Sequence, residues 1–329
     1  MKKIILIIIC CLFSAATTVL AQESGKIFLQ HNGTITNIYE YDGMSKAIEA
    51  AAEGDTLFLS SGNFNSGFTI NKSIAIIGTS ATGNNSSTIS WNGGESKIQT
   101  ENEKTISSIY IEGVSFNSDL QIYSKIKTFS IKKCYFNGIS LGYNSSNTEK
   151  ATIDRCRISS LSMGGQIKDL TCKNSQINNA NGGGFTITSC KIINCNIRRV
   201  ETYSKTMFIN SIINSVGNGT DSYLSSECIL VNTLYHNMNG YDPMQECSQQ
   251  DCWSSTETLI SDDDRYNCTL TADQLKKADY LGTDGTVVGC EGGVNPYTLE
   301  RHVPVITQKG TKVDLDSKKV IINVNVTAK

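Results

Sequence analysis

Four charged residues recur through the middle of the sequence at intervals that suit acid–base chemistry. They are Lys132, Asp154, Arg157 and Lys173. A basic side chain that takes a proton and a neighbouring carboxylate form a minimal set for proton transfer on an anionic polymer. On a solvated surface, the same charges would instead form weak ion pairs of about 0–1 kcal/mol each. These four residues are the candidate catalytic set, and their role depends on the elements that position them.

A repeat supplies those elements. From about residue 107, an apolar residue is followed three positions later by a small residue, and two positions after that by a second apolar residue. The small position falls at Val114, Cys134, Cys156, Ser175, Cys190, Ser211 and Cys228. A period of about 20 residues indicates a solenoid of short units. Strand segments rich in Ile, Thr and Ser, with Asn in the turns, favour an all-β parallel β-helix over leucine-rich repeats.

The repeat also predicts which side chains share an outer face. Side chains alternate along a strand, so Phe129 and Ile131 are expected to point inward. One predicted outward column contains Glu112, Lys132, Asp154, Lys173 and Thr188. The next contains Ser115, Tyr135, Arg157, Gln176, Lys191 and Ile212. The four charged candidates would then lie within two coils of one another, with Tyr135 and Lys191 beside them as substrate-binding candidates.

The pattern is lost between residues 235 and 268, where we expect an irregular excursion. Tyr241 and Trp253 are further substrate-binding candidates, because aromatic faces pack on sugar rings. Asp262, Asp263 and Asp264 offer oxygen ligands for calcium, the one cofactor that the sequence suggests. The alternative is a C-terminal cap, stapled by some of Cys247, Cys252, Cys268 and Cys290. Their pairing cannot be deduced from the sequence.

Two further patterns favour packing over chemistry. Ser and Val replace Cys at the small position, which a metal or redox site would not tolerate, so the cysteines there are expected to be small buried hydrophobes. Residues 138–142 read Gly-Ile-Ser-Leu-Gly, which matches the G-x-S-x-G of a nucleophile elbow. Ser140, however, lies between two apolar residues of a predicted strand, and no helix follows.

The first 21 residues predict export. Lys2 and Lys3 precede an apolar run over residues 4–13, and Val19-Leu20-Ala21 resembles a cleavage site. An uncleaved membrane anchor is the alternative. We expect a periplasmic, cell-surface or secreted protein with no membrane span after cleavage. The formal net charge of -2 shows no basic excess, so nucleic acid is not an expected partner.

One short helix is expected near residues 43–53, as a cap over the first coil, because an open solenoid end exposes apolar residues and strand edges. The segment AIEAAAEGDTLFLSSGNF, residues 47–64, resembles the phrase that follows the capping helix in the pectin-lyase-like right-handed parallel β-helix superfamily. Residues 282–299 resemble the closing segment of uncharacterised exported β-helix proteins of Gram-negative bacteria.

This resemblance implies a right-handed β-helix over residues 22–303, between the signal peptide and a C-terminal β-hairpin at 304–329. Lyases of the superfamily use an Arg or Lys base beside carboxylates, often with calcium, and its hydrolases use clustered aspartates, which the repeats here lack. The fold also hosts proteins without catalytic activity. We therefore expect a glycan-associated binding or surface protein. The alternative is a polysaccharide lyase or a related enzyme that acts on an acidic glycan.

Overall fold

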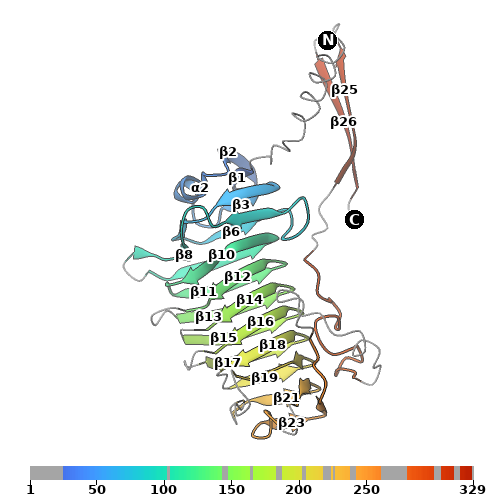
Figure 1. Cartoon of the computed structure of the whole chain (residues 1–329). Coiled ribbons are helices and arrows are strands. Elements are labelled where there is room, and N and C mark those ends of the chain that lie inside the picture. Colours follow the sequence, from blue (N-terminus) through green and yellow to red (C-terminus); the bar gives the residue numbers. More distant parts are fainter. Residues whose placement is uncertain are drawn as a thin grey trace, which may run out of the picture.

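The computed structural model describes residues 25–101, 104–142, 147–163, 166–182, 187–201, 205–217, 224, 227–237, 242–260, 280–299, 305–314 and 319–327. It is mostly β, a parallel β-solenoid of about eight turns with one short helix (Figure 1). The predicted parallel β-helix is thereby confirmed. No helix in the described part of the chain is long and apolar enough to cross a membrane.

Two sheets of twelve strands each form the body of the solenoid. Sheet 1 runs, in spatial order, β2 (Thr34–Glu40), β1 (Lys26–His31), β3 (Thr56–Leu59), β6 (Ile74–Ile77), β9 (Ile106–Glu112), β11 (Ile126–Lys132), β13 (Asn147–Asp154), β15 (Gln166–Lys173), β17 (Ile187–Ile193), β19 (Thr206–Ile209), β21 (Ile229–Val231) and β23 (Ser248–Gln250). Sheet 2 runs β24 (Trp253–Ser255), β22 (Leu234–His236), β20 (Ile212–Ile213), β18 (Asn196–Glu201), β16 (Gln176–Asn181), β14 (Arg157–Ser162), β12 (Tyr135–Ser140), β10 (Val114–Ile122), β7 (Ser87–Ser90) and β4 (Gly62–Asn65). Off this path, β8 (Ser96–Ile98) pairs with β10, and β5 (Thr69–Ile70) pairs with β8. Except for β1 and β2, neighbouring strands within these sheets pair in parallel.

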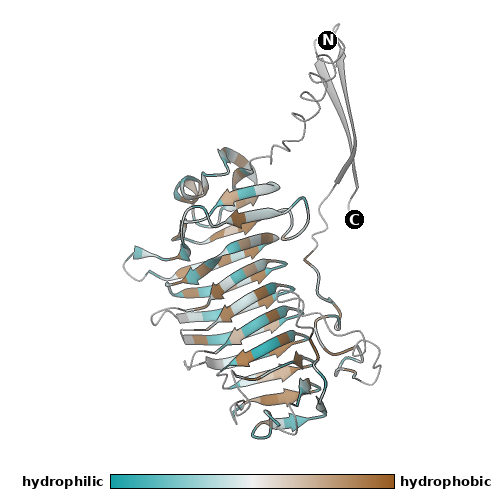
Figure 2. Cartoon of the chain, in the orientation of Figure 1, coloured by the Kyte–Doolittle hydropathy of each residue, from teal (hydrophilic) through white to brown (hydrophobic). Residues whose placement is uncertain are grey.

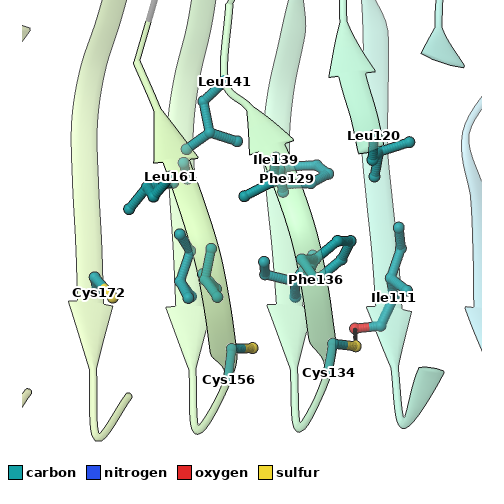
Figure 3. Packing of buried hydrophobic residues seen from close by; sticks show 14 of the residues in the cluster. Ile111, Leu120, Phe129, Cys134, Phe136, Ile139, Leu141, Cys156, Leu161 and Cys172 are labelled. Atoms are coloured by element: carbon teal, nitrogen blue, oxygen red, sulfur yellow. Dashed lines mark hydrogen bonds between the residues drawn. The ribbon is translucent and has the colours of Figure 1, made fainter. Parts of the chain in front are cut away.

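The interior between the sheets is filled by apolar side chains that alternate with outward polar ones (Figure 2). Phe129 and Ile131 are fully buried, as predicted. Phe116 and Phe136 of adjacent turns stack with ring centroids 4.7 Å apart. Figure 3 shows this packing, with Cys134 and Cys156 at the ends of their strands, where the chain turns. The buried apolar residues of successive turns form one continuous cluster that extends from Ile27 to Met244.

A sharp corner carries the chain from sheet 1 to sheet 2 in every regular turn. The residue at this corner has a positive φ of between 44° and 67° in eight successive turns: Gly113, Lys133, Arg155, Asn174, Asn194, Asn210, Asn232 and Asp251. Gly, Asn and Asp tolerate this left-handed conformation best. A small residue follows each of these positions: Val114, Cys134, Cys156, Ser175, Cys195, Ser211, Thr233 and Cys252.

The predicted register is wrong in two turns, as the positions of the corner residues Asn194 and Asn232 show. Cys195 and Thr233 occupy the small position, where the sequence pattern placed Cys190 and Cys228. Lys173 therefore pairs with Ile193, and Thr188 is not in its column. In sheet 2, Gln176 pairs with Asn196, where Lys191 was expected. In the first of these turns the pattern matches twice, because both Ile187 and Ile192 begin it. In the second, the placement at Cys228 began at Ser225, which is not apolar, whereas Leu230 and Thr233 fit the pattern.

The predicted irregular excursion over residues 235–268 is also partly wrong, because the solenoid continues through it. Strands β23 and β24 add a further turn, with Asp251 at its corner. The repeat was hard to recognise here because β23 reads Ser-Gln-Gln and lacks the apolar alternation of the other strands.

The one helix of the described residues, α2 (Met44–Ala50), packs against the first turn. Its Met44, Ala47 and Ile48 side chains are buried in the main core. The helix is shorter than predicted because Ala51 is already extended. Just after it, the buried carboxylate of Asp55 accepts the Ala52 N–H at 2.8 Å and lies 2.6 Å from His31 Nδ1, which joins the helix to β1 and β3.

Residues 280–299 form a strap over the outside of the last turns. Asn196 Oδ1 accepts the Cys290 N–H at 3.0 Å, and Asn210 Oδ1 accepts the Thr283 N–H at 3.0 Å. Beneath the strap is a second apolar cluster, made of Ile212, Leu234, Leu259, Ile260 and Val288, with Trp253 and Tyr280 packed against it. Further along, β25 (Val305–Asp314) and β26 (Lys319–Thr327) form an antiparallel pair within the predicted hairpin segment.

Substituting Ile48 by Asp tests the packing of the helix. We expect Ile48→Asp to lower the free energy of unfolding by at least about 3 kcal/mol, because it buries an unpaired carboxylate. Thermal unfolding and soluble yield are the measurements. Lys46→Asp, on the exposed side of the same helix, is the control and should change stability by less than about 0.5 kcal/mol. Equal melting temperatures for the two variants would contradict this packing.

Asn210 has two roles that two substitutions separate. Asn210→Gly removes the side-chain contacts with Thr283 but leaves a residue that readily adopts the positive φ. Asn210→Ala removes the same contacts and also puts a residue with a Cβ into this unfavourable conformation. We expect urea unfolding to show losses of about 1–2 kcal/mol for Gly and at least about 1 kcal/mol more for Ala. The reverse order would show that backbone conformation at this corner does not limit stability.

Candidate functional site

Three of the four charged candidates lie in one column of sheet 1. Asp154 ends β13, and its register partners on the adjacent strands are Lys132 of β11 and Lys173 of β15. Glu112 continues the column on the other side of Lys132. This part of the predicted column is confirmed. Arg157, the fourth candidate, lies around the corner in β14 of sheet 2.

The carboxylate of Asp154 is already engaged. Its Oδ2 accepts from Arg155 Nη2 at 3.0 Å and from Arg155 Nε at 3.3 Å, and its Oδ1 accepts from Asn174 Nδ2 at 3.3 Å. The side chain is 12% exposed and that of Arg155 is 15% exposed. A buried carboxylate that a guanidinium contacts through two nitrogens is held in one orientation. Arg155 was missed by the sequence analysis, because only the corner conformation turns it back onto its neighbour.

On sheet 2, Tyr135 and Arg157 form a stacked pair. The guanidinium carbon of Arg157 lies 5.5 Å from the centre of the Tyr135 ring, within the range of a cation–π interaction. The Tyr135 hydroxyl is 3.5 Å from Ser159 Oγ. The two residues are register partners on β12 and β14, as the predicted column required. Both residues lie on the outer face of sheet 2, where they are half-buried.

The other predicted binding residues lie elsewhere. Lys191 is exposed on β17 of sheet 1, between Thr171 and Met207, so it does not share the Tyr135 column. Trp253 packs into the second apolar cluster, with its ring 5.4 Å from that of Tyr280 in an edge-on contact. Tyr241, Asp262, Asp263 and Asp264 lie outside the described residues.

Two polar rows next to the Tyr135–Arg157 pair were not anticipated. Successive register partners across β10, β12, β14, β16 and β18 are Asp119, Gly138, Ser160, Asn179 and Arg199 in one row, and Gln121, Ser140, Ser162, Asn181 and Glu201 in the other. Gly138 lets the Asp119 carboxylate lie over the backbone, since a Cβ there would be 2.4 Å from Asp119 Oδ1. The rows put amide, hydroxyl and carboxylate groups at the strand spacing of about 4.8 Å.

Several of these polar side chains are held by neighbouring groups. Asn137 Nδ2 donates to Asp119 Oδ1 at 3.2 Å. The Tyr123 hydroxyl donates to Gln121 Oε1 at 2.8 Å. Ser140, the centre of the G-x-S-x-G match, is one member of a row. It lies between the buried Ile139 and Leu141 at the end of strand β12, and the next described element is strand β13, so the described residues show no strand–turn–helix of a nucleophile elbow.

Six cysteines in the described residues are free thiols: Cys134, Cys156, Cys172, Cys190, Cys195 and Cys252. Burial raises the pKa of Cys190 to about 12 and that of Cys228 to about 11. Thiols with such pKa values are poor nucleophiles at neutral pH. The described part of the chain also contains no group of three or more His, Cys, Asp or Glu residues that could hold a metal ion. The side chains of Cys134, Cys156, Cys172, Cys190, Cys195 and Cys228 are part of the main apolar core.

Comparison of the chain with protein-family models, with curated proteins and with solved structures finds no match.

The buried thiol of Cys190 predicts a pH dependence. In the folded protein this thiol keeps its proton up to a pH of about 12, whereas the unfolded chain releases it near 9.0. Its contribution to stability is present below pH 9 and is lost as the pH rises toward 12. Between these limits, Cys190→Ala should reduce the pH slope of the unfolding free energy by about 1.4 kcal/mol per pH unit.

Urea unfolding between about pH 8 and pH 10.5 measures this slope. Ser189→Ala is the control, because it alters the adjacent residue without removing a titrating group. Identical slopes for wild type and Cys190→Ala would show that the thiol does not titrate differently on folding.

Proposed function

We propose that the protein is an exported glycan-associated β-helix protein that binds through the outer face of sheet 2 and has no catalytic role. The observation that supports this function is the pair of polar rows beside the Tyr135–Arg157 stack. Hydroxyl-rich polymers are recognised by such planar aromatic and guanidinium groups together with short hydrogen-bonding side chains. A polysaccharide or another cell-surface component is the proposed partner.

The regular spacing of the rows favours a polymeric ligand. A chain that lies across the strands meets Asp119, Ser160 and Asn179 in one row at steps of about 4.8 Å or a multiple of it. The rows contain both carboxylates and Arg199, so their charge is mixed. This composition suits neutral or weakly acidic sugars, while Arg157 provides a position for an acidic one.

The second candidate, a polysaccharide lyase, is favoured by one observation: Asp154 lies between Lys132 and Lys173 in register. We place it second because the Asp154 carboxylate is bound by Arg155 and Asn174 and cannot turn toward a substrate without breaking those bonds. A lyase here would use Lys132 or Lys173 as the base, and it would need the Asp154 carboxylate beside that base to face the substrate.

The proposal also includes the handedness of the solenoid, its superfamily and the role of its helix. We infer that the solenoid is right-handed and related to the pectin-lyase-like superfamily, and that α2 caps its first turn, because Met44 and Ile48 are buried against it. The N-terminal signal supports a location in the periplasm, at the cell surface or outside the cell. Calcium, if bound, is proposed at Asp262, Asp263 and Asp264.

A panel of acidic and neutral glycans tests the proposal, with binding, unsaturated products and new reducing ends measured on the same samples. We expect binding without either product. Tyr135→Ala and Arg157→Ala should each weaken binding by about tenfold, because each removes half of the stacked surface. Lys191→Ala, on the other sheet, is the matched control and should bind like wild type.

Each alternative has its own result. Unsaturated products that disappear in Lys132→Ala would replace the binding role with the lyase. Binding that survives both sheet 2 substitutions would move the site to another face. No binding and no product with any glycan would overturn both proposals.

A further inference from the structure

The first strand of sheet 1 in spatial order has an unpaired edge. Within the described part of the chain, β2 pairs with β1 on one side and with no strand on the other. It is seven residues long, it contains no Lys or Pro, and its Ile35 and Ile38 side chains are 44% and 62% exposed. Natural proteins usually protect such edges with a charge, a proline or a covering segment, because an open edge is a template for another strand.

A β-bulge determines where these side chains point. Gln30 pairs with Ile35 and Leu29 pairs with Asn37, so Thr36 is the extra residue of β2. Phe28 pairs with Ile38, and both Phe28 and Gln30 lie on the outer face, because they alternate with the buried Ile27 and Leu29. Ile35 and Ile38 therefore share this outer face. Without the bulge they would lie on opposite faces.

The exposed residues of β2 continue an apolar stripe along sheet 1. Ile38, Phe28, Phe58 and Ile77 are successive register partners on β2, β1, β3 and β6, and the last three are half-buried. Beyond Ile77 the column becomes charged with Glu112. The stripe thus ends at the open edge of β2, where it lacks a partner.

We propose that two copies of the protein associate through this edge, β2 against β2, around a twofold axis. In the antiparallel register that puts Ile35 opposite Ile38 of the second copy, the axis passes between Thr36 and Asn37. Both isoleucine pairs then lie on the same outer face, which only the bulge allows. The two apolar stripes become continuous, and sheet 1 of one copy extends into sheet 1 of the other.

A second copy suits this edge better than an unrelated strand, because the edge is complementary to itself. Its one charged residue, Glu40, is bonded to Lys26 of the same chain at 2.5 and 2.6 Å. In the proposed register Glu40 lies opposite Gly33 of the second copy, so no like charges meet. Such a twofold contact closes on itself and adds no third copy.

The opposite end of sheet 1 does not offer an alternative partner for this edge. Strand β23 is three residues long, and all three of its residues, Ser248, Gln249 and Gln250, are exposed and polar. Head-to-tail stacking of β2 on β23 would set the apolar stripe against glutamine side chains. The two ends of the solenoid therefore predict dimers, and they argue against filaments.

Sedimentation equilibrium of the purified protein over about a hundred-fold range of concentration tests the proposal. We expect a monomer–dimer equilibrium. Ile38→Lys should weaken dimerisation by at least about tenfold, since it places two like-charged side chains beside the twofold axis. Ile229→Lys is the matched control: Ile229 is 39% exposed on sheet 1 but lies in β21, far from the edge, and its substitution should leave the dimer intact.

The melting temperature of each variant shows whether the fold is retained. If Ile38→Lys lowers it, Ile35→Lys is the second test, because Ile35 is its partner across the axis. A wild-type protein that stays monomeric at every concentration would overturn the proposal. So would a dimer that both lysine variants leave unchanged, because its interface would then be elsewhere, or an assembly larger than a dimer.

Discussion

The solenoid depends on a backbone constraint that every regular turn must meet: one residue between sheet 1 and sheet 2 adopts a positive φ. This conformation bends the chain sharply enough for the next strand to stack on the turn before it. L-residues pay about 1–2 kcal/mol for it unless they are Gly or, to a lesser degree, Asn or Asp. The four asparagines from Asn174 to Asn232 lower this cost where the strap covers the solenoid. Lys133 and Arg155 adopt the same conformation at the full energetic cost.

The same corner determines what each outer face can do. It places Asp154 at the end of β13, and it turns Arg155 back onto that carboxylate, so the charge that the repeat offers for catalysis is used to hold the turn. Two residues later the chain is on sheet 2, where Arg157 stacks on Tyr135. The Arg155–Asp154 ion pair, which holds the turn, and the proposed binding surface thus lie on opposite sides of one bend.

The sequence was sufficient for the architecture and for part of the site. Inward Phe129 and the Lys132–Asp154–Lys173 column follow from simple alternation and period. The register was lost at Cys190 because Ile187 and Ile192 both begin a matching pattern, and Asn194, the residue with positive φ, was the signal that distinguishes them. Trp253 could not be placed, because the partner that buries it, Tyr280, is 27 residues away, in a strap with no repeat pattern of its own.

The most direct measurement of the central claim, that sheet 2 binds glycan, is side-chain footprinting by hydroxyl radicals with and without a bound oligosaccharide. Among the described strands, β12 of sheet 2 carries the half-buried Tyr135 and β9 of sheet 1 carries the half-buried Tyr110. We expect the ligand to protect Tyr135 and to leave Tyr110 unchanged. Protection of Tyr110 alone would contradict the account and would put the ligand on the lysine-bearing face.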